Sequence, residues 1–150
     1  MENDKVTIRD MIEEDITGAL AVDKGIVGTD RVLTYKNPRT SYLGGEMGLS
    51  KVAVIDGEVV GFAIGGIITH PFTIEDVGFL NLIGVLPRHQ RKGIASNLIK
   101  GFIKTCNERK VERLITLVNL KDEQMASLFR SVGFSQSDVT EFSISTGDME

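Results

Sequence analysis

The spacing of apolar residues along this chain shifts repeatedly between a period of two and a period of about 3.6, which predicts alternating strands and helices. β-rich runs bounded by turn signals predict strands at residues 6–9, 51–55, 59–64, 79–85, 113–118 and 139–144. Helical spacing with end signals predicts helices at residues 10–25, 28–37, 95–106 and 122–133. With no repeat or linker between these segments, the pattern favours a single α/β domain over residues 1–150.

Glycine, proline and polar capping residues mark where these elements begin and turn. Asp10 with Glu13 is the expected cap of the first helix, and Asp56-Gly57 is a strong hairpin signal between two β-rich runs. Residues 40–49 are turn-rich and predict a loop, and residues 65–76 predict a looser connection. Gly84 lies inside a predicted strand, which indicates a bulge or a close backbone approach.

Composition narrows the class of protein. The chain has 150 residues, of which 41% are hydrophobic and 25% charged, as in an ordinary soluble domain. It has no apolar run of the roughly 20 residues that a membrane span needs, and its first residues lack the regions of a signal peptide. A single cysteine fits a reducing cytoplasm, where we expect the protein. The net charge of −4 disfavours nucleic acid and mildly favours a cationic substrate such as an amine.

The segment between the strand ending at Val85 and the helix beginning near Ala95 is the clearest candidate site. It contains a proline turn, a short basic loop and Gly93. The first amides of a helix lack intrahelical partners and lie at the positive end of its dipole, and successive loop amides can form a concave nest. The segment therefore predicts an anion cradle, against the simpler interpretation of a basic surface turn.

Two motifs resemble the GNAT superfamily of acyl-CoA-dependent N-acyltransferases. Residues 90–95, Gln-Arg-Lys-Gly-Ile-Ala, resemble its Q/R-x-x-G-x-G/A pyrophosphate loop. Residues 122–134 resemble its N-x-x-A-x-x-L-Y-x-x-x-G-F block; Leu128, Gly133 and Phe134 match, and Asp122, Met125 and Phe129 depart. The resemblance covers nearly the whole chain and implies a GNAT-like fold, a mixed central sheet of six to seven strands with about four helices on both faces.

The resemblance also implies acetyl-CoA as the cofactor. In the family, loop amides bind the CoA pyrophosphate, the fourth strand offers backbone groups near a bulge, and the fourth and fifth strands splay to admit the cofactor. The late block packs beside the pantetheine arm. The implied cofactor residues here are Ile83, Gly84, Val85, Gln90, Arg91, Lys92, Gly93, Ile94, Ala95, Ser96, Asp122 and Phe129.

Catalytic residues are harder to assign. Where the family often has a tyrosine that protonates the departing thiolate, this chain has Phe129, so water or another residue would serve. Glu75 and Asp76 are the expected base, acting directly or through water, and the alternative interpretation is a solvated charge pair. Tyr35 and Tyr42 fall where substrate walls often lie in the family, or are core anchors. With two histidines and one cysteine, no metal site is visible.

The expected activity is transfer of acetyl from acetyl-CoA to a primary amine, of a small molecule or a protein N-terminus, in a ternary complex. The alternative is a module that binds or senses acyl-CoA without turnover, and a third is an unrelated α/β protein with a fortuitous loop. The last predicted strand leaves little chain for the closing hairpin of many relatives, so a shortened sheet or a partner subunit, as in a homodimer, would compensate.

Overall fold

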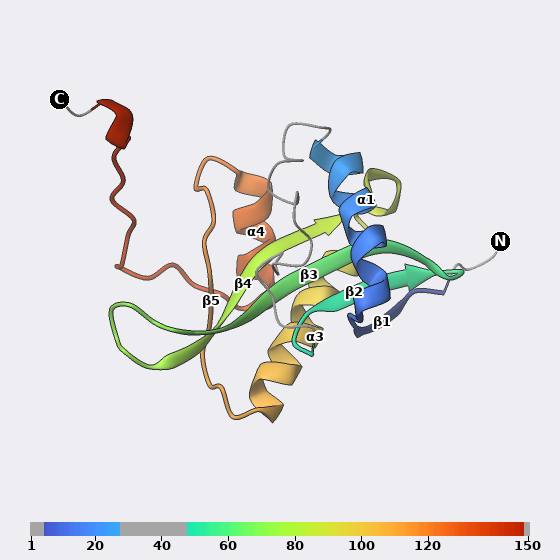
Figure 1. The fold of residues 1–150 in the computed structure, drawn as a ribbon, viewed down its shortest axis with the longest axis horizontal. Helices are drawn as coiled ribbons and strands as arrows, with labels where there is room; N and C mark the ends of the chain where they lie inside the picture. The colour runs from blue at the N-terminus through green and yellow to red at the C-terminus, as the bar shows by residue number, and fades with distance from the viewer. Residues whose placement is uncertain (1–4, 28–47, 149–150) are drawn as a thin grey trace.

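The structure is a computed structural model that describes residues 5–27 and 48–148 (Figure 1). Its strands are β1 (Thr7–Asp10), β2 (Lys51–Ile55), β3 (Glu58–Thr69), β4 (Asp76–Val85) and β5 (Leu114–Thr116). Its α-helices are α1 (Ile16–Val27), α3 (Ile94–Glu108) and α4 (Glu123–Val132). Short 3₁₀ turns are η1 (Glu13–Asp15), η4 (Pro87–His89) and η5 (Thr146–Asp148).

The strands form one sheet in the order β1-β2-β3-β4-β5. Neighbouring strands from β1 to β4 are antiparallel, and β5 is parallel to β4, so the expected mixed α/β sheet is confirmed. The expected number of elements is wrong. The described residues hold five strands and three α-helices, not six to seven strands and about four helices. The helix predicted at residues 28–37 and most of the loop predicted at 40–49 lie outside the described residues.

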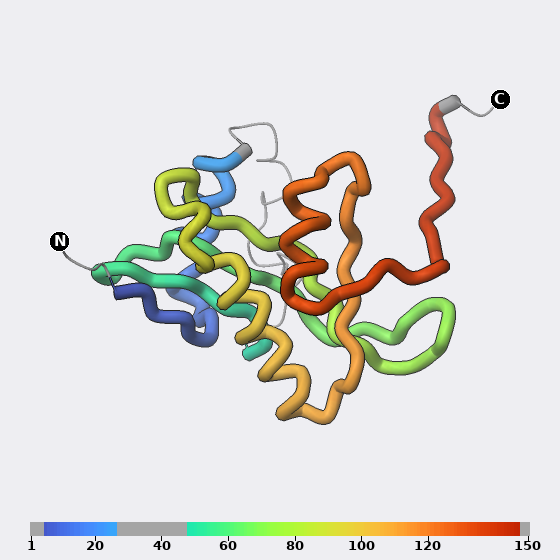
Figure 2. The backbone as a smooth tube through the Cα atoms, turned by 180° about the vertical axis from the view of Figure 1, so that it is seen from behind, coloured from blue at the N-terminus to red at the C-terminus, as the bar shows by residue number. Residues whose placement is uncertain are grey.

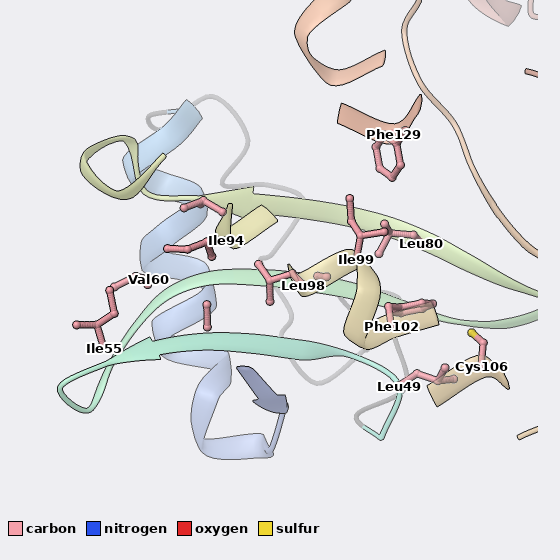
Figure 3. Close-up of a cluster of buried hydrophobic side chains, with 13 residues drawn as sticks. Leu49, Ile55, Val60, Leu80, Ile94, Leu98, Ile99, Phe102, Cys106 and Phe129 are labelled. Carbon is pink, nitrogen blue, oxygen red and sulfur yellow. The ribbon is translucent and has the colours of Figure 1, made fainter. Parts of the chain in front are cut away.

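Helices cover both faces of the sheet because successive strand residues point to opposite sides. Val52 and Phe62 pack with α1 on one face. Their neighbours Ala53 and Ala63 pack with α3 on the other. Figure 3 shows this second layer, with Leu98, Ile99 and Phe102 of α3 lying against the sheet and Phe129 of α4 beside them.

The β3–β4 pair is longer than the sequence predicts. The segment expected to be loose is largely strand, since β3 continues to Thr69 and pairs there with Asp76. In the sequence, Gly65-Gly66 indicates the end of a strand. In the structure, Gly65 provides close packing, because a Cβ there would overlap the carbonyl oxygen of Phe79 and lie 2.7 Å from Phe102 Cζ.

The first helix begins later than predicted. Asp10 ends β1, and its carboxylate pairs with Lys51 instead of capping the helix. The carboxylate of Asp15 accepts hydrogen bonds from the Ile12 backbone N–H at 2.9 Å and from the Arg9 guanidinium at 2.7 and 3.0 Å. These bonds, the Arg9 bond foremost, hold the pKa of Asp15 below its usual range despite burial.

The bulge predicted at Gly84 is in a different place. Gly84 pairs regularly with Phe62, and the register shifts where Ile64 faces Leu82 while Gly65 faces Leu80. Asn81 is therefore the extra residue, and it forms the β4 bulge. Gly84 instead marks a close approach, because a Cβ there would lie 2.8 Å from Ile26 Cδ1 of α1.

The strand predicted at residues 139–144 is absent. The segment forms no strand, and its apolar side chains are exposed. A segment with an alternating pattern forms a strand only where a neighbouring strand pairs with its backbone. None of the five described strands pairs with this segment.

We predict that Gly65→Ala destabilises the protein by about 1–3 kcal/mol, the usual cost of overpacking a filled interior. The added methyl must displace the β4 backbone or the ring of Phe102. Gly147→Ala is the matched control, since a Cβ there meets no described atom within 4 Å. Urea unfolding of both variants gives the difference, and equal stability would contradict the close packing at Gly65.

Candidate functional site

The pairing of β5 with β4 ends part-way along β4, which continues beyond it (Figure 1). They pair only from Gly78 opposite Leu114 to Leu80 opposite Thr116. Thr116 Oγ1 closes this ladder by donating a hydrogen bond to the Leu80 carbonyl at 2.8 Å. Beyond the Asn81 bulge, β4 stays paired with β3, while its ladder with β5 has ended. We call the β5-facing side of residues 81–85 the open edge of β4.

The direction of the β4 backbone decides which groups line the open edge. The Leu86 N–H donates to the Val60 carbonyl at 2.9 Å, so alternate residues such as Gly84 also direct their N–H and C=O toward β3. Ile83 and Val85 then direct theirs to the open edge. Of the three strand residues expected to bind a cofactor, Ile83 and Val85 are oriented for main-chain contacts there, and Gly84 is not.

The loop after β4 is tied to the same edge. The Gln90 side chain donates from Nε2 to the Val85 carbonyl at 2.8 Å, which holds the loop against the strand end. Arg91 has φ of 66° and Gly93 has φ of 83°, both left-handed. Left-handed residues alternating with other conformations turn successive N–H groups toward one point, as in an anion-binding nest. A Cβ at Gly93 would meet no described atom within 4 Å, so its open side faces free space.

The N-terminus of α3 adds further donors. The first helical bond runs from Asn97 N–H to the Gly93 carbonyl at 3.1 Å. The N–H groups of Ile94, Ala95 and Ser96 precede that bond and have no intrahelical acceptor. They lie at the positive end of a helix that runs from Ile94 to Glu108. The loop and helix start therefore form the anion cradle that the sequence predicts.

The charged side chains of the loop fall into two groups. Arg91 and Lys92 are exposed beside the cradle, where they can attract an anion. Arg88 instead forms a surface ion pair with Glu58 at 3.2 Å. His89 lies between them, and its buried Nδ1 has no hydrogen-bond partner among the described residues. The cationic character of the cradle comes mainly from Arg91 and Lys92.

Phe129 and Asp122 lie on α4, next to α3. Phe129 is 4% exposed and belongs to the core cluster that includes Leu80 (Figure 3). Its ring meets that of Phe134 edge-on, with centroids 5.0 Å apart. Asp122 caps the helix, since its carboxylate accepts a hydrogen bond from the Met125 N–H at 3.0 Å. Both residues therefore hold α4 in place, and Phe129 does so beside Leu80, where β4 and β5 part.

Glu75 and Asp76 lie at the opposite end of β4 from the loop. At a rise of about 3.4 Å per residue, Asp76 is roughly 17 Å from the Asn81 bulge and roughly 30 Å from Val85. Glu75 pairs with Arg113 at 3.3 Å, and Asp76 accepts a hydrogen bond from Thr69 at 3.3 Å. The structure does not bring these carboxylates to the cradle.

Two further reactive side chains, Cys106 and His70, have structural roles. Burial raises the pKa of the Cys106 thiol, which keeps it protonated in the core. His70 is buried, and its Nδ1 accepts the N–H groups of Phe72 and Thr73 in the β3–β4 turn. Tyr35 and Tyr42 lie outside the described residues. Within the described ranges, no cluster of metal-binding side chains occurs and no helix is long and apolar enough to cross a bilayer.

Sequence reasoning missed Asn81 and Thr116. Asn81 places the bulge at the start of the open edge, and Thr116 ends the β4–β5 ladder there. Neither position carries a local signal, because both depend on the register between strands.

Comparison with known families identifies the fold around this cradle. Residues 20–134, well over half of the chain, match the family described as Acetyltransferase (GNAT) family. This chain belongs to the GNAT acetyltransferases. The resemblance of its loop and of the α4 block is thereby confirmed as a family relationship. No curated protein matches the chain significantly.

Solved GNAT structures share the fold at low sequence identity. The aminoglycoside N-acetyltransferase AAC(6')-Iy in complex with CoA superposes with a TM-score of 0.74 at 18% identity, covering 97% of both chains. A ribosomal-protein-alanine N-acetyltransferase from Brucella melitensis biovar Abortus 2308 gives 0.72 at 24%, covering 94% of this chain and 99% of that one. An aminoglycoside acetyltransferase from an uncultured soil metagenomic sample, in complex with trehalose, gives 0.73 at 16%, covering 93% and 95%.

We predict that Asp122→Ala lowers the free energy of unfolding by about 1 kcal/mol, because the Met125 N–H loses its capping acceptor. Asp122→Asn is the matched control, since its amide oxygen can still cap the helix. Chemical unfolding measures both. An asparagine variant as unstable as the alanine variant would show that the carboxylate has a role other than capping.

Proposed function

We propose that this protein is an N-acetyltransferase that moves acetyl from acetyl-CoA to a primary amine by direct transfer in a ternary complex. The observation that carries the proposal is the union of two features. A nest and helix N-terminus suited to a pyrophosphate adjoin an open strand edge suited to an extended amide-bearing arm. Gln90 joins the two by hydrogen bonding the Val85 carbonyl.

The cofactor would lie along these groups from phosphate to thioester. The amides from Arg91 to Ser96 bind the pyrophosphate, with Arg91 and Lys92 adding positive charge. The pantetheine arm lies along the open edge as a further strand would, and its amides hydrogen bond the backbone groups of Ile83 and Val85. Two structures of one neighbour support CoA as the ligand, since AAC(6')-Iy has been solved with CoA and with the bisubstrate analogue CoA-S-monomethyl-acetylneamine.

The acceptor is a primary amine of a small molecule or of a protein N-terminus. Similar folds include enzymes named for aminoglycosides and one named for a ribosomal-protein alanine. Those identities, at or below 24%, leave both acceptor classes open for this chain. A net charge of −4 favours a cationic acceptor in either case.

Proton transfer distinguishes this chain from the usual family pattern. The thiolate needs a proton as the thioester breaks, and the phenyl ring of Phe129 has none to give. We infer that water at the open edge supplies it. Glu75 and Asp76 stay the sequence-based prediction for the base, but their distance from the bulge argues for a water relay or for another group.

The second candidate function is a module that binds acyl-CoA without turnover. The buried phenyl ring of Phe129 and the remote carboxylates favour it, because neither supplies a proton carrier at the thioester. Cofactor binding is common to both functions, since the cradle and the open edge act through main-chain groups. Turnover alone separates them.

We predict that the protein binds CoA and releases free thiol from acetyl-CoA when a primary amine is added. Binding is measured by calorimetry and release by a thiol-reactive dye, across an amine panel that includes aminoglycosides and an alanyl peptide. Saturable binding with no release from any amine would favour the binding module. Absence of binding would overturn both functions.

One variant pair ties this result to the cradle. Gly93→Asp places a carboxylate in the free space beside the loop amides, so CoA affinity should fall at least tenfold. Gly57→Asp is the matched control, because Gly57 has a similar φ of 80° and equally open surroundings in the β2–β3 turn. Aspartate tolerates the left-handed region, so both variants should fold. Equal CoA affinity in the two variants would contradict the pyrophosphate assignment.

We also predict that Phe129→Tyr raises kcat if protonation of the thiolate limits turnover. A hydroxyl on this ring restores the family's proton donor beside the β4–β5 opening. Phe134→Tyr is the control, because it adds the same group to the partner ring of the aromatic pair. A gain confined to Phe129→Tyr supports the inference of a water donor in the natural chain. Unchanged kcat with unchanged stability would show that thiolate protonation is not limiting.

A further inference from the structure

Asn81 is the extra residue of the β4 bulge, and it has the one polar side chain between Asp76 and the end of that strand at Val85. Its side chain is exposed. The residues on either side of it pack in different clusters, Leu80 with α3 and Leu82 with α1. In a regular strand, two residues that are two positions apart share a face. The bulge therefore reverses the alternation at this point.

This reversal decides on which face of the sheet the Asn81 side chain lies. Ile83 packs with the α3 cluster, as Leu80 does, so the two residues between them have the opposite face. Leu82 occupies that face, where it packs with α1. The Asn81 side chain thus lies on the α1 face. Figure 2 shows α3 in front of the sheet and α1 behind it.

The bulge is closed on the α3 face and accessible on the α1 face. Leu80 is 1% exposed and Phe129 is 4% exposed, so core side chains fill the α3 face beside the bulge. On the α1 face, the last turn of α1 covers β4 further along, because a Cβ at Gly84 would lie 2.8 Å from Ile26 Cδ1. Asn81 lies three residues before Gly84 and is exposed. A ligand that reaches the bulge from the α1 face therefore meets the Asn81 amide.

The open edge of β4 ends at the same residue. Beyond the bulge, Ile83 and Val85 offer their backbone groups, whereas β4 up to Leu80 is paired with β5. Thr116 Oγ1 already donates to the Leu80 carbonyl at 2.8 Å. An extended arm that follows the open edge from the cradle must therefore stop at the bulge. In the proposed function, that end of the arm carries the thioester.

We propose that Asn81 orients the acceptor amine, an inference that rests on the proposed N-acetyltransferase function. Its side-chain oxygen accepts a hydrogen bond from an N–H of the neutral amine, which directs the amine lone pair at the thioester carbonyl. The nitrogen bonds to the carbonyl carbon, and the C–S bond breaks with its electron pair on sulfur. The excess proton on nitrogen passes through water to the thiolate.

An amide suits this role better than a carboxylate would. A carboxylate beside the amine favours the ammonium ion, which has no lone pair for attack. The neutral oxygen of Asn81 holds the amine without removing its proton and without stabilising the charged form. The neighbouring side chains on the same face, Leu82 and Ile64, are apolar. The Asn81 amide is therefore the polar side-chain group that this part of β4 offers an amine.

The test is the affinity of the CoA-saturated protein for the amines of the panel, measured by calorimetry, together with KM and kcat for thiol release. Asn81→Leu keeps the size of the side chain and removes its oxygen, so amine affinity should fall about tenfold, with CoA affinity unchanged. Asn81→Asp keeps an oxygen in the same place and should retain at least a third of the natural amine affinity. Asn107→Leu replaces an exposed asparagine in the last turn of α3 and is the matched control, which should change neither affinity.

The outcomes distinguish this inference from the proposed function. Thiol release by the natural chain, with equal amine affinity in Asn81→Leu, overturns the inference and leaves the function intact. No thiol release from any amine overturns the function, whereas amine affinities of the CoA complex still measure the role of Asn81. No saturable amine binding by that complex overturns the inference.

Two further results would also overturn the inference. A loss of CoA affinity in Asn81→Leu would show that the residue shapes the open edge and does not act on the amine. An Asn81→Asp variant that binds amines as weakly as Asn81→Leu would show that the amide acts through its N–H groups, since a carboxylate keeps the acceptor oxygen and lacks those donors.

Discussion

The structure depends on the point at which β4 stops sharing hydrogen bonds with β5. Up to Leu80 the sheet satisfies its own backbone, and Thr116 adds a side-chain bond to the last carbonyl. One residue later the Asn81 bulge shifts which residues direct their backbone groups toward β3. Beyond it, the N–H and C=O groups of Ile83 and Val85 point away from β3. Backbone N–H and C=O groups removed from a ladder require another partner. The open edge is thus a binding surface created by an interrupted sheet.

Packing on both sides of the bulge holds that interruption in place. Gly65 lies across from Leu80 and lets β3 approach β4 closely beneath Phe102. Phe129 closes the other side, packed with Leu80 and against the ring of Phe134. A phenyl ring satisfies this position fully as a packing group, whereas a phenol there would have to place a buried hydroxyl. Phe129 therefore packs in the core without a buried hydroxyl group, but it cannot donate a proton.

Local features of this chain could be predicted from its sequence, and features set by register could not. The sequence predicts the β2–β3 turn and the loop before α3 correctly, because Asp56-Gly57 and Gly93 readily adopt the left-handed backbone that these turns require. The bulge lies at Asn81 and not at the strand glycine Gly84, because its position depends on the register between β3 and β4, which the sequence does not encode locally. The loop and the α4 block predict the family relationship, and residues 28–47 lie outside the described residues.

The predicted last strand, residues 139–144, illustrates the same limit. Its alternation is genuine, but a strand is a property of a pair, and a single copy offers it no partner among the described residues. Intramolecular reasoning from the sequence counts that strand as part of the sheet and overestimates the number of strands. The exposed side chains of Phe142 and Ile144 show that period-two alternation alone does not distinguish a paired strand from an extended segment on the surface, because both carry the same pattern.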